Sequence, residues 1–407
     1  MKTLIYILLF GISLFNYAFS QGGSNYSILG IGDQIKTIGA SYDGIAGTSI
    51  AIPSDYSINT NNPALWSYVT HTRLSAGYRF NQNYITNKDF SLYQNNGKID
   101  GIKILFSIDT SLGIAATFGV VPYSSVNYLI STPVFKNIEG LELTGQNYYS
   151  GSGGLSQAFL GASIKLTDYA SMGIMGLAAF GKISNSIRTI FYDYYGYSSE
   201  TLFEDYFSGI GYKAGIYINP IKNAGIGIFY ESNPELDYQR KMTYYSQLVR
   251  DSSSSLNLSS KIPSRFGLGL SYTLGKVMLG FDYIQQDFTN FDYKGGPLVK
   301  FKNYSSISFG LKRLGNKSLS AELADRITYN LGFGYNQLYY NISSTDINEI
   351  YGSFGFEIPI VGTAILNTAI TLGSRGTNDN GLLKEMFGRL NIDVSIGEIW
   401  FKPYRRD

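Results

Sequence analysis

The 407-residue sequence contains no cysteine and a single histidine, His71. The lack of cysteine excludes a disulfide scaffold, a thiolate metal site and cysteine catalysis. A single histidine excludes a multi-histidine metal site. A Ser-His-Asp triad could use only His71, and no Gly-x-Ser-x-Gly sequence is present to carry its serine. We therefore predict no enzyme, no catalytic residue, no metal and no cofactor.

Charge is also scarce, because Asp, Glu, Lys and Arg make up 15% of the chain, whereas soluble domains average about 25%. The formal net charge is only +2, so no nucleic-acid partner is expected. Beyond the N-terminus no apolar run approaches the roughly 18 residues of a membrane-spanning helix. The composition excludes a helical membrane protein, and only a β-barrel could still span a bilayer.

The N-terminus has the pattern of a secretory signal peptide. Lys2 supplies a positive charge, residues 4–15 are apolar, and Ala18 and Ser20 provide a small-x-small cleavage site before Gln21. A single anchoring helix is the alternative, but its apolar core of 12 residues is shorter than the roughly 20 that a spanning helix needs. We assign residues 1–20 to the signal peptide.

The sequence is rich in aromatic residues and glycine, with 35 Tyr, 25 Phe and 46 Gly. From Thr72 onward, apolar and polar side chains alternate with the period of a β-strand. Over residues 327–336, for example, Ile, Tyr, Leu, Phe and Tyr alternate with Thr, Asn, Gly, Gly and Asn. In a barrel, one parity would face lipid and the other the lumen. A soluble sandwich has the same alternation, so the period alone does not separate the two folds.

The lengths of the links between the strands distinguish a barrel from a soluble sandwich better than the strand period does. The alternating runs predict fourteen strands, at 72–80, 101–108, 111–121, 155–166, 170–183, 209–219, 223–231, 263–274, 276–287, 304–312, 327–336, 349–358, 363–373 and 388–401. Short and long links alternate between them, as periplasmic turns and external loops do in outer-membrane barrels. The sequence thus predicts an all-β transmembrane antiparallel barrel over residues 72–401, a tail at 402–407, and both termini in the periplasm. The long links, such as 81–100, 122–154, 184–208 and 232–262, are expected to be exposed, mobile loops; only the link at 313–326 is longer than its position predicts.

Residues 21–71 lack sustained alternation and precede the first predicted strand. About 50 residues are too few for a dependable independent core, so we expect a plug, or hatch, folded inside the barrel. A disordered periplasmic tail is the alternative, but the many apolar residues of the segment argue against it.

Several side chains have predicted places in this barrel. Charged residues on the polar parity are expected to pair with one another or to contact the plug, and a head-group site for a charged ligand is the alternative. They are Lys103, Lys213, Asp282, Lys312, Glu357 and Asp393. Trp66, Trp400 and Phe401 are expected at the periplasmic interface, where amphipathic rings are favoured. Phe401 and its aromatic neighbours also resemble the C-terminal signal that barrel assembly machinery reads, although Lys402 and the tail follow.

The region before the first strand resembles the hatch of FadL-type outer-membrane transporters. The resemblance lies in residues 39–47 and in the Asn-Pro-Ala signature of Asn62, Pro63 and Ala64, followed by Leu65. Residues 262–272 and 280–283 are similar to the family's proline-led strand and its hairpin partner. The family's acidic stretch before Asn-Pro-Ala is replaced here by residues 54–59, which leaves the contacts of the plug open.

The resemblance implies passive uptake of long-chain fatty acids or other hydrophobic molecules through a plugged barrel, with sideways release through a gap in its wall. Lateral exit keeps an apolar ligand out of water, and it predicts an apolar pocket above residues 40–65. Pro122 and Pro133 remove strand donors where such a gap could form; an exposed loop is the alternative for this region.

A second function fits the same fold, because the chain also resembles PorV-type accessory or shuttle barrels of type IX protein secretion. That function predicts no enclosed ligand pocket and a protein partner on the long loops. The expected partners are thus a hydrophobic small molecule, outer-membrane lipid and lipopolysaccharide, and the barrel assembly machinery during biogenesis.

Overall fold

The computed structural model describes residues 23–400, except 37, 89, 139, 193–197, 233–234, 247–251, 294, 296–298 and 319. The predicted signal peptide at 1–20, Phe401 and the tail at 402–407 lie outside the described residues. Among the helices that are described, none is long and apolar enough to cross a membrane.

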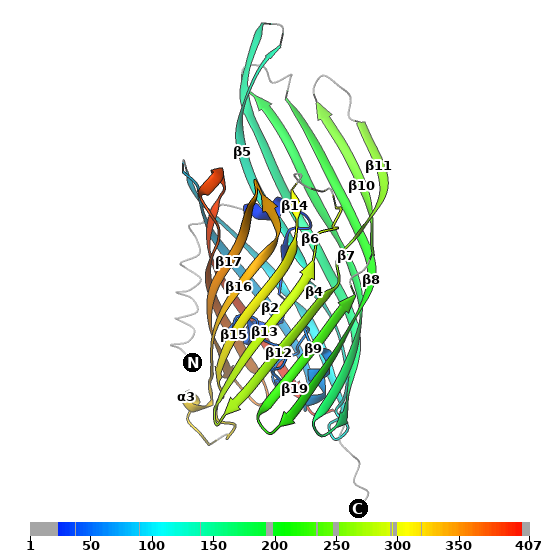
Figure 1. Cartoon of the computed structure of the whole chain (residues 1–407), viewed down its shortest axis with the longest axis vertical. Helices are drawn as coiled ribbons and strands as arrows, with labels where there is room; N and C mark the ends of the chain where they lie inside the picture. The colour runs from blue at the N-terminus through cyan, green and yellow to red at the C-terminus, as the bar shows by residue number, and fades with distance from the viewer. Residues whose placement is uncertain are drawn as a thin grey trace, which may run out of the picture.

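Fourteen antiparallel strands form a closed barrel (Figure 1), as the alternation and link lengths predicted. They are β2 (Thr72–Thr86), β3 (Ser91–Asp109), β4 (Ile114–Pro122), β6 (Leu141–Thr167), β7 (Ala170–Phe191), β8 (Ser199–Ile221), β9 (Ala224–Ser232), β12 (Arg265–Leu274), β13 (Val277–Asp287), β15 (Asn303–Arg313), β16 (Thr328–Ile342), β17 (Thr345–Pro359), β18 (Ile365–Gly376) and β19 (Lys384–Glu398). The seam that closes the ring joins β19 to β2, from Lys384 opposite Thr86 to Glu398 opposite Thr72. Because the ring is closed, the barrel wall has no free edge along this seam.

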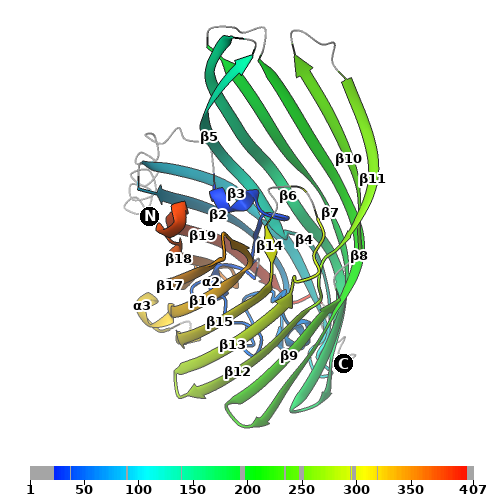
Figure 2. The same ribbon diagram turned by 45° about the horizontal axis from the view of Figure 1, so that its top comes forward.

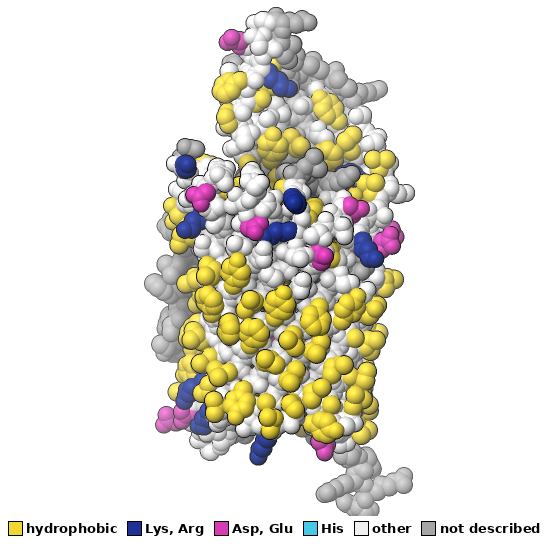
Figure 3. Space-filling model, viewed as in Figure 1, with side chains coloured by type: hydrophobic (Ala, Val, Ile, Leu, Met, Phe, Trp, Pro, Cys, Tyr) yellow, Lys and Arg dark blue, Asp and Glu magenta, His cyan; other side chains and the backbone are white. Residues whose placement is uncertain are grey.

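The two faces of the strands differ as predicted. In β16, Leu331 and Phe333 are exposed on the outside, whereas Asn330 and Asn336 are buried inside. Figure 3 shows the outward side chains as a hydrophobic belt, with charged side chains above it and along its lower rim. Such a belt matches the hydrocarbon layer of a bilayer.

On one side the wall rises well above the rest of the barrel (Figure 2). Here the upper parts of β6, β7 and β8 continue as one sheet. Strand β5 (Ser124–Ile138) pairs with β6, β10 (Glu235–Ser246) pairs with β8, and β11 (Ser252–Lys261) pairs with β10. We call this sheet, in the order β5-β6-β7-β8-β10-β11, the raised wall. The expected long loops at 81–100, 122–154, 184–208 and 232–262 are therefore wrong, because most of their described residues lie in strands. Their alternation is weak because a sheet outside the bilayer needs no apolar lipid face.

The N-terminal segment fills the lumen (Figure 2). The described residues 23–71, which we call the plug, contain the 3₁₀-helix η1 (Asn25–Ile28), strand β1 (Asp33–Gln34), helix α2 (Ala40–Asp43) and the 3₁₀-helix η2 (Pro63–Tyr68). Most plug side chains are buried. The plug packs on the wall from the inside, with η2 against β6, β7 and β8 and α2 against β17 and β18.

The described residues also include the short elements β14 (Lys300–Phe301), α3 (Leu323–Arg326) and η4 (Asp379–Gly381). The link before β14 folds inward, so that Phe288, Phe291 and Tyr293 are buried. Tyr293 donates a 2.7 Å hydrogen bond to Asp205 at the base of the raised wall. Burial, together with the nearby Asp205 carboxylate, raises the pKa of Tyr293 well above its usual value, so the hydroxyl remains a donor.

Candidate functional site

Buried carboxylates of the barrel bind the backbone of the plug. Asp282 of β13 accepts hydrogen bonds from the amides of Ser49 at 2.6 Å and Ile50 at 3.0 Å. Asp393 of β19 accepts one from the amide of Ala40 at 2.5 Å. Charge-assisted bonds of this kind are stronger than neutral ones, so they fix the plug to the wall.

Buried cations of the wall contact the plug in the same way. Lys312 pairs with Glu357 at 2.5 Å, and both contact the hydroxyl of Ser41. Lys103 donates to the carbonyl of Ile38 at 3.1 Å. Lys213 donates to the carbonyl of Thr60 and pairs with Glu231. The prediction that the lumen charges pair with one another or contact the plug is confirmed.

The Asn-Pro-Ala motif lies where the plug meets the wall. Asn62 caps η2, because its Oδ1 accepts from the amide of Ala64 at 3.1 Å and Pro63 is the first residue of the helix. Its Nδ2 donates to the carbonyls of Ile50 in the plug at 2.8 Å and Ile216 in β8 at 3.1 Å. One side chain thus joins two plug segments to the barrel.

We expect Asn62→Ala to loosen the plug without unfolding the barrel. The substitution removes a helix cap and leaves two carbonyls without their amide donor, which should cost about 1–3 kcal/mol. Limited proteolysis of the purified protein should cut the plug faster in this variant. Asn257→Ala, on the exposed β11, is the matched control and should leave the cleavage rate unchanged.

The aromatic residues expected at the interface occupy two different places. Trp66 is wholly buried, packs in a cluster with Leu105 and Phe159, and donates its indole N–H to the carbonyl of Asn59. Its predicted interfacial position is therefore wrong, because η2 turns the ring into the lumen before the chain enters β2. Trp400 is exposed beyond the end of β19 and contacts Phe106.

Glycines let the plug approach the wall closely. Nine neighbouring strands, from β6 to β17, each present an inward glycine on which a Cβ atom would collide with the plug. They are Gly161, Gly173, Gly215, Gly227, Gly269, Gly280, Gly310, Gly332 and Gly355. This glycine belt lets the plug come into close contact with the wall on nine of the fourteen barrel strands. These glycines lie at the polar, lumen-facing positions of the alternating pattern. The pattern alone could not predict that each one contacts the plug.

A split in the wall lies beside the third barrel strand. Pro122 ends β4, and the pairing of β3 with β4 extends only from Asp109 to Ile102. Above that point, no ladder joins the described residues of β3 and β5. Instead the plug strand β1 pairs with Ser124 and Ser125 of β5 from the inside. Pro133 lies higher, in the raised wall, where it pairs with Gln146 of β6.

The outer face of the split is apolar. A groove of about 790 Å³ lies between β3, β4 and β6, and apolar side chains dominate its lining. They include Ile99, Ile102, Ile104, Phe118, Val120 and Phe159. Lys98 closes the inner side of the split by donating to the hydroxyl of Ser125 at 2.5 Å.

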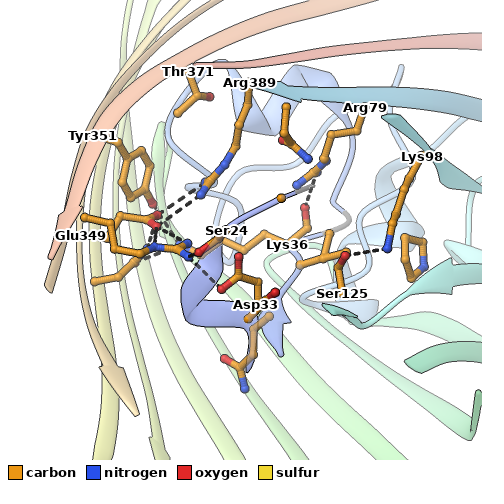
Figure 4. Close-up of a pocket in the computed structure, with 18 of the residues that line it drawn as sticks. Ser24, Asp33, Lys36, Arg79, Lys98, Ser125, Glu349, Tyr351, Thr371 and Arg389 are labelled. Atoms are coloured by element: carbon orange, nitrogen blue, oxygen red, sulfur yellow. Dashed lines mark hydrogen bonds and ion pairs between the residues drawn. The ribbon is translucent and has the colours of Figure 1, made fainter. Parts of the chain in front are cut away.

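Inside the lumen, a charged cavity of about 120 Å³ lies between the plug and the wall (Figure 4). Arg375 pairs with Glu349 at 2.6 Å and with Asp33 of the plug at 2.8 Å. Arg79 pairs with Asp43 of the plug at 3.1 Å, and Arg389 pairs with Glu349 as well. These groups satisfy one another, so the cavity is not the apolar pocket that the sequence led us to expect.

Sequence reasoning did not single out this arginine network. Arg375 lies in a segment that was expected to be a loop, at 374–387, but it is the penultimate residue of β18. His71, the one residue considered as a catalytic candidate, is half-buried beside Thr70 and 4.0 Å from Asp55. Among the described residues, no group of three or more histidines or carboxylates is placed to hold a metal ion.

Several solved structures have folds similar to this one. A FadL homologue from Pseudomonas aeruginosa is 11% identical, with a TM-score of 0.62 over 89% of this chain and 98% of that one. The toluene transporter TodX of Pseudomonas putida is 14% identical, with a TM-score of 0.61 over 90% of this chain and 99% of that one. The toluene transporter TbuX of Ralstonia pickettii is 13% identical, with a TM-score of 0.58 over 88% of this chain and 97% of that one. At these identities the likeness shows the fold, which is that of FadL-type barrels.

A search of curated proteins found no match. The family model described as BamG, in contrast, matches residues 1–407, the whole length of the sequence. The chain therefore belongs to the BamG family.

Proposed function

We propose that this protein is an accessory subunit of an outer-membrane assembly machine, and that it works through contact with other proteins and not as an open channel. In this proposal the end of the barrel with the short links faces the periplasm, together with the end of β19. The raised wall then stands on the extracellular side.

The occupied lumen is the observation that carries the proposal. The plug is fixed by buried charges, by Asn62 and by the glycine belt, and the charged cavity between plug and wall measures about 120 Å³. Pockets for small organic ligands measure about 300–1,000 Å³ and are mostly apolar. A charged cavity of this size does not suit a long-chain fatty acid.

The family name and the shape of the barrel support the same function. The name BamG carries the designation of the barrel assembly machinery. The raised wall adds a sheet above the hydrophobic belt that a passive pore does not need. A plugged barrel with a tall external sheet suits a subunit that holds or guides a partner.

Purification from native outer membranes in a mild detergent tests this function. We expect subunits of the assembly machinery to copurify in a fixed ratio, and deletion of the gene to lower the amounts of several outer-membrane proteins. A barrel that purifies alone, together with normal outer-membrane protein levels in the deletion strain, would contradict the proposal.

A second candidate function is uptake of hydrophobic molecules with lateral release, which the apolar groove at the wall split favours. Val120→Trp would fill that groove and should reduce uptake of a labelled fatty acid severalfold in a host that lacks its own transporter. Leu331→Trp, on the lipid face of β16, is the control. Uptake that does not exceed the level of the empty host would eliminate this candidate.

A further inference from the structure

The outer edge of the raised wall is an unprotected strand edge. β11 pairs with β10 through ten consecutive residue pairs, from Ser252 opposite Tyr244 to Lys261 opposite Glu235. No described residue pairs with its other side, and nine of its ten residues are exposed. Figure 1 shows β11 as the outermost strand of the raised wall. Its free edge therefore presents a row of backbone donors and acceptors to solvent.

Exposed edges in soluble regions are usually protected by proline, inward charge, a bulge or a covering segment. β11 contains no proline, pairs with β10 without a bulge, and carries a single charge, Lys261, at its lower end. Ser260, next to this lysine, is the one buried residue and donates to Asp292. The rest of the edge has none of these protections.

The opposite edge of the same sheet is protected. β5 contains Pro133, which has no N–H to donate, and carries the exposed Lys136 nearby. Its lower part is covered, because the plug strand β1 pairs with Ser124 and Ser125, and Gly23 donates to the carbonyl of Asn127. One edge of the sheet is thus protected and the other is open. The lack of protection is therefore specific to β11 and not common to both edges of the raised wall.

The side chains of β11 also differ between its two faces. Leu256 and Leu258 are 59% and 38% exposed, and they lie opposite Arg240 and Tyr238 on the face that packs on Tyr293. Ser255, Asn257 and Ser259 point to the other face. Two leucines exposed to water above the hydrophobic belt are unfavourable by themselves and would be covered by an apolar side chain beside them.

We infer that β11 is a docking strand, on which an extended segment of a partner protein adds as a further strand of the raised wall. The partner segment would place apolar side chains beside Leu256 and Leu258 and polar ones beside Ser255 and Asn257. Backbone pairing supplies the affinity, and this alternation supplies the register. The inference rests on the proposed function, since it names how the subunit holds its partner.

A second copy of this chain does not suit the edge. Antiparallel pairing of two identical β11 strands needs a two-fold axis perpendicular to the strands. Because β11 continues into the membrane-spanning β12, that axis would lie near the membrane plane and would invert one of the two barrels. We therefore assign the edge to a different polypeptide.

Site-specific photo-crosslinking in intact cells tests the inference. A photoreactive residue is placed in turn at each position from Ser253 to Ser259, and the crosslinked peptides are identified by mass spectrometry. Strand addition predicts that the crosslinked partner residue moves by one position along a single segment for each step along β11. Scattered partner residues, a second copy of this chain, lipopolysaccharide, or the absence of crosslinks would each overturn it.

Proline substitution gives a second, independent readout. Consecutive residues of a strand direct their N–H groups to opposite edges, so one of Ser254→Pro and Ser255→Pro removes a donor to β10 and the other removes a donor to the free edge. The variant that loses the donor to the free edge should keep the folded barrel and recover about tenfold less partner. Ser254→Thr and Ser255→Thr, which keep both N–H groups, are the controls.

If both proline variants recover the wild-type amount of partner, docking on β11 is wrong, although copurification with the assembly machinery would still support the proposed function. If no subunit of the assembly machinery copurifies even with the wild-type chain, the proposed function itself is contradicted. The two results are therefore distinguishable.

Discussion

Replacing Gly332 with valine is expected to prevent normal assembly of the plugged barrel. A Cβ atom at this position would fall on the backbone of Ile45 and Ala46, well inside van der Waals contact. Neither backbone can move freely, because Ile45 follows α2 and Gly332 lies in the middle of β16. Overpacking costs typically 1–3 kcal/mol, and more where backbone must shift, so we expect a loss of about 3 kcal/mol or more.

The amount of folded, heat-modifiable protein in outer membranes measures this effect, and proteolysis shows whether the plug is displaced. Gly352→Val in the neighbouring strand is the matched control, since a Cβ there would meet only the carbonyl oxygen of Gly332, at 3.8 Å. Wild-type yield and wild-type proteolysis in the Gly332 variant would show that the glycine belt does not confine the plug.

Glu231→Ala is expected to destabilise the barrel about as strongly. Glu231 is wholly buried and pairs with Lys213 at 2.7 Å and Arg265 at 2.7 Å. The substitution leaves two largely buried cations without their common partner, and breaking a buried pair in this way costs about 3–5 kcal/mol. Lys213 would also hold the carbonyl of Thr60 less well, so the plug should loosen together with the wall.

Urea unfolding in lipid vesicles, followed by tryptophan fluorescence, measures the change in unfolding free energy. Glu204→Ala is the control, because its partner Lys182 is 44% exposed, and exposed pairs contribute about 0–1 kcal/mol. Equal free energies of unfolding for the Glu231 and Glu204 variants would show that the buried triad does not stabilise the barrel.

The sequence predicted the barrel because each transmembrane strand must present an apolar side chain to lipid at every second position. That requirement ends where a strand leaves the bilayer. Residues 252–261 are mostly serine, and their two leucines are too few to reveal a strand period, although these residues form a strand. Pairing in the raised wall depends on neighbouring strands and not on a lipid face, so it could not be predicted from local pattern.

For the site, the sequence located the charges but not all of their partners. Asp282 and Asp393 were placed in the lumen by parity, and the structure shows that both accept plug amides. Arg375 was missed because the predicted strand ended at residue 373, three residues before the end of β18 at Gly376. Trp66 was misplaced because an aromatic residue before a strand has the same local pattern whether its ring faces lipid or the lumen.

The seam of the barrel has a consequence for the order of assembly. In β19, the last strand of the described chain, Glu385 accepts a 2.6 Å hydrogen bond from the hydroxyl of Ser24, and Asp393 accepts one from the amide of Ala40. The earliest part of the described chain therefore finds its final partners only when the last strand arrives. Seating of the N-terminal part of the plug and closure of the ring therefore become a single cooperative event, and a chain without β19 lacks these two plug contacts even where the earlier strands have formed.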